Sequence, residues 1–183
     1  NIGIISENGS IKVNKYNQTN IPNIYAIGDV SGPPWLAHVA SAQGVVSVEH
    51  AFEDDAETID YNNIPGCTYT QPQVGSIGLT ERVALSKGFK IKVGKYSFRS
   101  NGKAMAVGHN DGFIKLIFDE KYGELLGAHI IGSEATELIG QLSMAKALES
   151  TWEDLAFGVF AHPTFSEAIM EAALDAYDIG IHQ

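Results

Sequence analysis

The stretch that most constrains the fold runs from residue 112 to residue 131 and reads GFIKLIFDEKYGELLGAHII. Two apolar runs stand on either side of the polar segment EKYGE, which contains a glycine. Apolar runs joined by such a short polar segment predict a β-hairpin. Because an isolated hairpin is at best marginally stable, this one needs further strands or helices to cover its apolar faces.

The residues around the hairpin supply those partners. Strands are predicted before the hairpin, one segment being broken at Pro72 and another alternating apolar and basic residues. Helices are predicted mainly after the hairpin. The predicted strands cover 67–80 and 90–98, and the predicted helices cover 81–88, 133–150, 151–156 and about 165–177. Strands first and helices later are typical of an α+β fold, here an antiparallel sheet flanked by helices. Residues 98–108 are predicted as a basic surface loop.

The first third of the chain has a different pattern. A short strand pair is predicted to turn at Asn8-Gly9, and a β-type run follows at Asn23–Gly28. A non-helical loop rich in glycine and proline then leads to a predicted helix at Leu36–Phe52, and the acidic segment Glu53–Glu57 is interpreted as a solvated linker. We therefore place a domain boundary near residue 62, which gives domains 1–62 and 63–183.

Composition argues against several classes of function. The chain has 183 residues, a formal net charge of −10 and a pI near 4.9, which argues against a nucleic-acid partner. No apolar run approaches the roughly 18 residues that span a bilayer, so no membrane partner is expected. The single cysteine, Cys67, excludes an internal disulfide framework and a cysteine-based zinc site, and it suits a reducing cytosol. The histidines do not fall in metal-ligand spacing, so no metal site is predicted.

Asp29 is the first candidate site residue. It follows a β-type run and precedes a Gly/Pro loop and a predicted helix, and open α/β sheets bind ligands at such strand ends. An aspartate that only stabilises a turn is the alternative from spacing alone. The helix that starts near Leu36 adds free N–H groups and the positive end of its dipole, which suit an electron-rich ring.

His162 and Glu167, in the segment FAHPTFSEAIMEAALDA, are the second candidate. Thr164 and Glu167 have the spacing of a capping box, which explains Glu167 without catalysis. Alternatively, Glu167 accepts one ring N–H of His162, and the other ring nitrogen is left to accept a proton. The two uses are compatible if Glu167 turns toward His162 instead of back to the Thr164 amide.

Several segments together resemble the C-terminal part of the dihydrolipoamide dehydrogenases, which are class I pyridine nucleotide-disulfide oxidoreductases. The segments are IPNIYAIGDVSGPPWLAH, YTQPQVGSIGLTE, GFIKLIFDEKYGELLGAHIIG and AHPTFSEAIMEAALDA, in the family's order and spacing. The resemblance covers nearly the whole chain. It implies that residues 1–62 are the end of an FAD-binding α/β region with a remnant of the NAD-binding region, and that residues 63–183 are the interface domain that pairs two subunits.

The resemblance also assigns roles to the candidate residues. Asp29 is expected to hold a ribityl hydroxyl of FAD, and the backbone of Leu36, Ala37 and His38 to approach the flavin ring. His162 is expected to be the acid–base catalyst and Glu167 its partner, acting across the dimer on dihydrolipoamide. Electrons then pass through a disulfide and FAD to NAD+, and the expected partners are a second copy of the chain and the lipoyl-bearing E2 subunits of a cytoplasmic 2-oxoacid dehydrogenase complex.

The motifs that are missing bear on activity. The family's glycine-rich FAD motif, its redox-active cysteine pair and its NAD motif do not occur in these residues. Since the chain also begins without methionine, we expect a fragment that retains no cofactor and is inactive alone. The alternatives are a flavoprotein reductase of the glutathione or mercuric type, and a purely structural dimerisation module.

Overall fold

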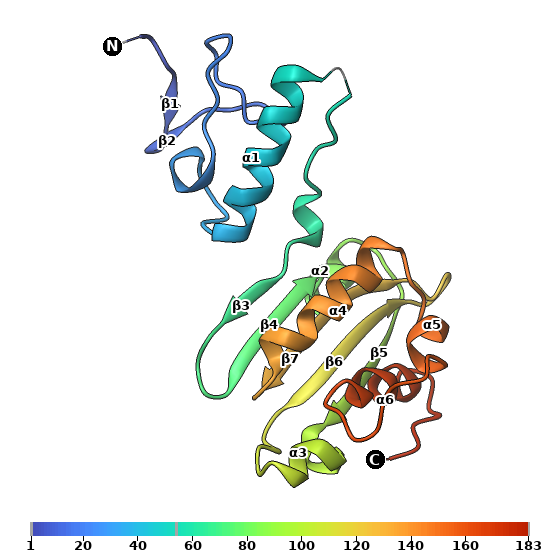
Figure 1. The fold of residues 1–183 in the computed structure, drawn as a ribbon. Helices are drawn as coiled ribbons and strands as arrows, with labels where there is room; N and C mark the ends of the chain where they lie inside the picture. Colours follow the sequence, from blue (N-terminus) through green and yellow to red (C-terminus); the bar gives the residue numbers. More distant parts are fainter. Residues whose placement is uncertain (1, 54, 183) are drawn as a thin grey trace. The chain divides into compact units, whose positions relative to one another are not determined.

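The computed structural model describes residues 2–53 and 55–182 and divides the chain into two compact units, Asn1–Tyr61 and Asn62–Gln183 (Figure 1). Asp54, part of the predicted acidic linker, lies outside the described residues, as do the two terminal residues. No helix in the described part of the chain is long and apolar enough to cross a membrane.

The first unit combines a small hairpin with one long helix. Strands β1 (Ser6–Glu7) and β2 (Ser10–Ile11) pair antiparallel, and the predicted turn is confirmed, with φ of 51° at Asn8 and 84° at Gly9. Asparagine and glycine tolerate these positive angles, which two-residue hairpin turns require. The 3₁₀ helix η1 (Gly28–Ser31) precedes α1 (Ala37–Phe52), so the predicted helix is confirmed while the loop before it is partly helical.

The β-type run predicted at Asn23–Gly28 is not a strand. Its only pairing among the described residues is an isolated bridge between Tyr25 and Gln18. An extended segment becomes a strand only when a neighbouring backbone offers a ladder of donors and acceptors, and here the neighbour offers one bridge.

The second unit contains a five-stranded antiparallel sheet in the order β3-β4-β7-β6-β5 (Figure 1). The strands are β3 (Gly66–Thr68), β4 (Gln73–Gly78), β5 (Ile91–Ser97), β6 (Phe113–Asp119) and β7 (Leu125–Gly132). The predicted hairpin is confirmed as β6 and β7, whose register pairs Phe113 with Ile131. The break predicted at Pro72 separates β3 from β4.

Helices cover both faces of this sheet, so the predicted α+β class is confirmed. The helices of this part of the chain are α2 (Glu81–Ser86), α3 (Gly102–Ala106), α4 (Ala135–Ala147), α5 (Trp152–Ala156) and α6 (Glu167–Asp175), with 3₁₀ turns η2 (Tyr61–Asn63) and η3 (Phe98–Ser100). Helices α4 and α6 lie on one face and share its main core, to which Leu116 of β6 contributes (Figure 1). The next residue, Ile117, packs with Ala84 of α2 in a second cluster, as the alternation of side chains along a strand requires.

Residues 98–108 do not form the solvated loop that we predicted. They form η3 and α3, and Phe98, Asn101 and Ala104 are buried. The Asn101 side-chain oxygen accepts the Ala104 N–H at 2.9 Å and caps α3. The prediction was wrong because it weighted the basic residues of the segment over its apolar anchors.

Close backbone packing fixes α6 on the edge strand β5. A Cβ at Gly94 would overlap the carbonyl oxygen of Ala172 and lie 2.7 Å from the Ala176 nitrogen, so only glycine lets the helix approach this closely. The Asp175 carboxylate also accepts the Lys95 N–H at 2.8 Å. Helix α6 carries Glu167 in its first turn, and these contacts therefore position that carboxylate.

Candidate active site

The structure brings the two predicted acid–base residues together. His162 Nδ1 lies 2.9 Å from Glu167 Oε1. The His162 side chain is 75% exposed and that of Glu167 is 20% exposed, so the carboxylate is sheltered while the ring faces solvent. Because an ionised carboxylate only accepts hydrogen bonds, Nδ1 carries the hydrogen and Nε2 is left as the acceptor of the neutral ring.

Glu167 also makes one half of the capping box that we treated as the alternative, but the other half is not formed, because Ser166 and not Thr164 is the N-cap residue of α6 and no side chain caps this helix. Its Oε2 accepts the Thr164 N–H at 2.8 Å, while the Thr164 hydroxyl donates to the Ala161 carbonyl oxygen at 2.7 Å. The expectation that Glu167 turns away from the Thr164 amide is therefore wrong, because each carboxylate oxygen serves one donor. The same carboxylate therefore holds both the backbone at Thr164 and the ring of His162.

The electrostatics of Glu167 follow from these contacts. Burial by itself would raise the pKa of Glu167, but the hydrogen bonds from the Thr164 amide and from His162, together with the nearby charges of His162 and His182, lower that pKa below its usual value. Glu167 is therefore ionised at neutral pH and holds the His162 ring in one orientation.

A cavity of about 230 Å³ adjoins this pair. Its walls come from β5, the η3–α3 segment, α6 and the C-terminal residues. The lining residues are Tyr96, Ser100, Asn101, Gly102, Met105, His162, Glu167, Glu171 and His182. Burial, with smaller effects from Glu171 and Glu167, raises the pKa of Tyr96 to about 12, so its hydroxyl stays protonated and able to donate.

The η3–α3 segment lies next to His162 and to the backbone that follows it. The Asn101 side-chain nitrogen donates to the Thr164 carbonyl oxygen at 3.0 Å, and a Cβ at Gly102 would lie 3.6 Å from His162 Cε1. Sequence reasoning missed these residues because it assigned the segment to a surface loop. It also missed Glu171, although its spacing of four from Glu167 places both carboxylates on one helix face.

The other predicted residues lie in the first unit. Asp29 is in η1 and is exposed, and the preceding Gly28 N–H donates to the Gln43 side-chain oxygen of α1 at 2.7 Å. This bond ties the Asp29 loop to the helix.

Leu36, Ala37 and His38 form the start of α1. Leu36 is its N-cap residue, no side chain caps this end, and no acidic residue stands in the first turn. The positive end of the dipole of this sixteen-residue helix therefore lies at these residues. With the exposed Asp29 carboxylate, these residues fit the polar and electron-rich parts of a flavin nucleotide.

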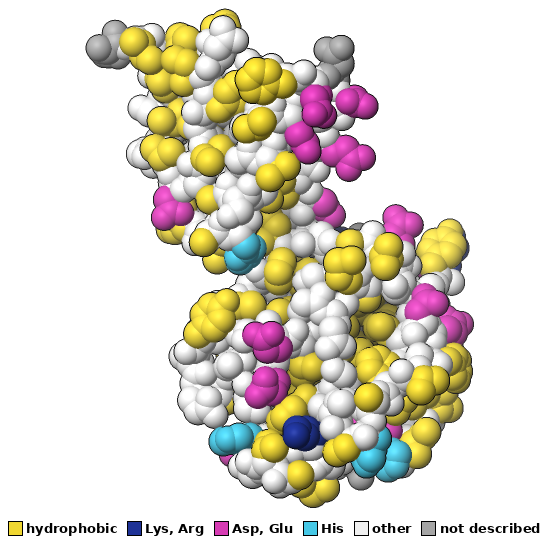
Figure 2. Space-filling model, viewed as in Figure 1, with side chains coloured by type: hydrophobic (Ala, Val, Ile, Leu, Met, Phe, Trp, Pro, Cys, Tyr) yellow, Lys and Arg dark blue, Asp and Glu magenta, His cyan; other side chains and the backbone are white. Residues whose placement is uncertain are grey.

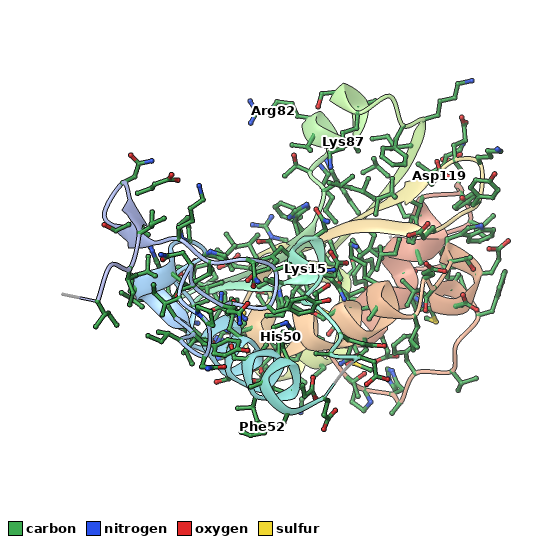
Figure 3. All side chains as sticks on the ribbon, turned by 90° about the horizontal axis from the view of Figure 1, so that it is seen from above. Lys15, His50, Phe52, Arg82, Lys87 and Asp119 are labelled. Carbon is green, nitrogen blue, oxygen red and sulfur yellow. The ribbon has the colours of Figure 1, made fainter. Side chains whose placement is uncertain are left out.

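The remaining histidine of α1 has a structural role. The ring of His50, which is labelled in Figure 3, stacks on Tyr16 with centroids 4.2 Å apart, and its Nδ1 lies 2.8 Å from the Tyr25 hydroxyl. Among the described residues, no group of three His, Cys, Asp or Glu side chains is placed to hold a metal ion.

Comparison with protein families gives two matches. The dimerisation domain of the pyridine nucleotide-disulphide oxidoreductases matches residues 64–173, and a second profile, described as pyridine nucleotide-disulphide oxidoreductase, matches residues 1–44. The chain belongs to the pyridine nucleotide-disulphide oxidoreductase family. The resemblance inferred from the sequence motifs is thereby confirmed.

Curated relatives sharpen this assignment. The chain is 50% identical to a dihydrolipoyl dehydrogenase of Rhizobium etli, over 96% of the chain and 37% of that relative. It is 46% identical to one of Zymomonas mobilis, over 99% of the chain and 39% of the relative. The chain thus spans well under half the length of these relatives.

Solved structures show the same fold. LpdA from Mycobacterium tuberculosis superposes with a TM-score of 0.88 at 26% identity, covering 94% of this chain and 38% of that one. The HOCl-induced flavoprotein disulfide reductase RclA from Escherichia coli also gives 0.88, at 25% identity, covering 93% of this chain and 40% of that one.

Proposed function

We propose that this chain supplies the acid–base pair and the subunit interface of a dihydrolipoyl dehydrogenase. The complete enzyme would oxidise dihydrolipoamide to lipoamide and pass the electrons through a disulfide and FAD to NAD+. The observation that carries the proposal is the 2.9 Å contact between His162 and Glu167 beside a cavity. The relatives named dihydrolipoyl dehydrogenase support it.

The chemistry follows from the orientation of the ring. With Nδ1 held by Glu167, the His162 Nε2 accepts the proton of a substrate thiol, and the positive charge that develops is stabilised by the carboxylate. A thiolate rather than a thiol attacks a disulfide, so removing this proton starts the exchange. The disulfide itself would lie in residues outside this chain.

For the cofactor, we propose that Asp29 holds a ribityl hydroxyl of FAD and that the backbone of Leu36, Ala37 and His38 approaches the flavin ring. The uncapped start of α1 and the exposed Asp29 support this. When bound, FAD supplies the electron transfer between disulfide and nicotinamide. We expect the chain alone to retain none, and a visible spectrum of the purified chain with flavin bands would contradict that.

We further propose that residues 1–62 belong to the FAD/NAD-binding region and residues 63–183 to an interface domain that forms a homodimer. Hydrophobic side chains gather at the surface of both units (Figure 2), and those with large exposure include Phe52, Leu148 and Val159. A partner surface would cover such side chains. A stable monomer in sedimentation at micromolar concentration would count against the dimer.

Two finer parts of the proposal concern the cellular setting. The partners would be the lipoyl-bearing E2 subunits of a 2-oxoacid dehydrogenase complex, and the location would be the cytoplasm.

A chain that acts only as a dimerisation module is the alternative, and it predicts that His162 can be replaced without effect on the turnover of the complete enzyme.

Replacement of His162 in the complete enzyme tests the function. His162→Gln should slow dihydrolipoamide oxidation by about 100-fold or more, the usual contribution of a general base, while flavin content stays unchanged. His109→Gln, which alters another exposed histidine of the second unit, is the matched control. Unchanged turnover in His162→Gln would refute the catalytic assignment, and preferred turnover of glutathione disulfide would favour a glutathione reductase.

A further inference from the structure

A second histidine–carboxylate pair lies in the same cavity as the first. Glu171 is buried at 3% exposure, and its Oε1 lies 2.7 Å from His182 Nδ1. Its Oε2 accepts the backbone N–H groups of Ile181 and His182, each at 3.1 Å. A buried carboxylate needs such partners, and the donors found among the described residues come from the C-terminal segment.

The two pairs are built alike. Glu167 and Glu171 are four residues apart on α6 and therefore lie on one face of the helix. Each carboxylate accepts from the Nδ1 of its histidine with one oxygen, and the other oxygen accepts one backbone N–H at Glu167 and two at Glu171. His162 and His182 both line the cavity, with exposures of 75% and 68% for their side chains.

The pairs also share an electrostatic environment. The charge of His182 is among the causes that lower the pKa of Glu167. Around the cavity, the titratable groups among the described residues are Tyr96 on β5, both glutamates on α6 and the two histidines, while η3–α3 contributes uncharged residues. A positive charge on the His182 ring is therefore felt by Glu167 of the other pair.

We propose that His182, held by Glu171, is a second proton acceptor of this site for a dithiol substrate. The inference rests on the proposed function, in which a dithiol must lose two protons. His162 Nε2 takes the proton of the first thiol, and the thiolate attacks the enzyme disulfide to form a mixed disulfide and one enzyme thiolate. His182 Nε2 takes the second proton, and the second thiolate attacks the substrate sulfur of that mixed disulfide. The substrate leaves as a cyclic disulfide, the enzyme disulfide has gained two electrons as a pair of thiolates, and each histidine holds one proton.

Two proton acceptors give this series of reaction steps an advantage over a single acceptor. A single base must release its first proton before it can take the second, whereas two imidazoles of separate pairs can each hold one. Both glutamates lie beside their histidines and stabilise the two positive charges that develop.

The kinetic test uses the complete enzyme with dihydrolipoamide. His182→Gln keeps a side-chain donor for Glu171 but removes the base, so the C-terminal segment stays anchored. We expect kcat to fall about 10-fold to 100-fold, and the pH profile of kcat to lose one ionisation, at unchanged flavin content. His109→Gln should match the unaltered enzyme.

The outcomes separate this inference from the proposed function. If His162→Gln slows turnover but His182→Gln matches His109→Gln in kcat and pH profile, only the second acceptor is refuted. If His162→Gln has no effect, the proposed function fails and this inference fails with it. A measurement without substitutions, long-range 1H–15N NMR of the purified chain, should find the neutral His182 ring protonated on Nδ1, and protonation on Nε2 would refute the acceptor role.

Discussion

His162 Nδ1 lies 2.9 Å from Glu167 Oε1, and the second oxygen of the same carboxylate accepts the Thr164 N–H at 2.8 Å. One side chain thus fixes both the start of the segment leading into α6 and the orientation of the candidate base. A substitution at Glu167 should therefore change stability and catalysis together, which is unusual for a residue with a purely local capping role.

Glu167→Gln should make the second unit less stable at neutral pH and less sensitive to acid. The folded state lowers the pKa of Glu167, so its contribution is present above the ordinary carboxyl pKa of about 4.5 and is lost as the pH falls through the folded value. The loss at pH 7 should be about 1–3 kcal/mol, the range for hydrogen bonds to charged groups. Urea unfolding between pH 3 and pH 7 measures both effects.

Glu120→Gln is the matched control, since Glu120 is exposed on the same unit. Its unfolding free energy should follow that of the unaltered chain across the whole pH range. Equal acid sensitivity in Glu167→Gln and the unaltered chain would show that the bridge to Thr164 and His162 does not favour the ionised carboxylate.

The elements with a regular hydrophobic pattern were predictable from the sequence. The β6–β7 hairpin, α1 and α4 carry apolar residues at strand or helix spacing, and this periodic pattern is sufficient to predict these elements. Helix α3 has five residues and no periodic signal, and it exists because Phe98 and Ala104 are buried by the rest of the unit. Such tertiary stabilisation leaves little trace in local sequence.

The candidate site was predictable only where its partners are close in sequence. His162 and Glu167 are five residues apart, and their relation could be inferred from spacing and resemblance. Glu171 and His182 are eleven residues apart and meet because the chain turns back after α6, where the Ile179 N–H donates to the Leu174 carbonyl oxygen at 3.1 Å. That reversal has no clear local signal.

Tyr96 should make the second unit sensitive to alkaline pH. The folded state raises its pKa from 10.0 to about 12, so the unfolded state loses the proton first and stability falls as the pH rises from 10 to 12. A shift of this size corresponds to about 2–3 kcal/mol over that interval. Tyr96→Phe should lose less stability there, and Tyr122→Phe, at an exposed tyrosine, should behave like the unaltered chain.

Gly94→Ala should be strongly destabilising, because its Cβ would overlap the Ala172 carbonyl oxygen of α6. We expect a loss of more than about 3 kcal/mol, since backbone on both sides must move. Gly140→Ala is the matched control: apart from its chain neighbours and the nearby backbone of α4 itself, no atom lies within 4 Å of the added Cβ, and the helix should gain about 0.5–1 kcal/mol. Thermal unfolding of both variants makes the comparison, and a mild effect at Gly94 would mean that α6 can shift on β5 without cost.

Asn101 offers the sharpest test of how α3 supports the site. It is 2% exposed, its oxygen caps α3 through the Ala104 N–H, and its nitrogen donates to the Thr164 carbonyl oxygen. Asn101→Ala removes both bonds and should cost about 2–4 kcal/mol, the sum of a lost cap and an unsatisfied buried carbonyl. Asn101→Asp keeps the capping oxygen but turns a second acceptor toward the Thr164 carbonyl.

The two variants therefore separate the two bonds. If the link to Thr164 matters more, Asn101→Asp should be at least as unstable as Asn101→Ala, and the His162 ring resonances should shift in both. If the cap matters more, Asn101→Asp should approach the stability of the unaltered chain, with His162 unperturbed. The structure favours the first result, because Glu167 binds the Thr164 amide and Asn101 binds the Thr164 carbonyl, and the loss of either bond frees the backbone that precedes α6.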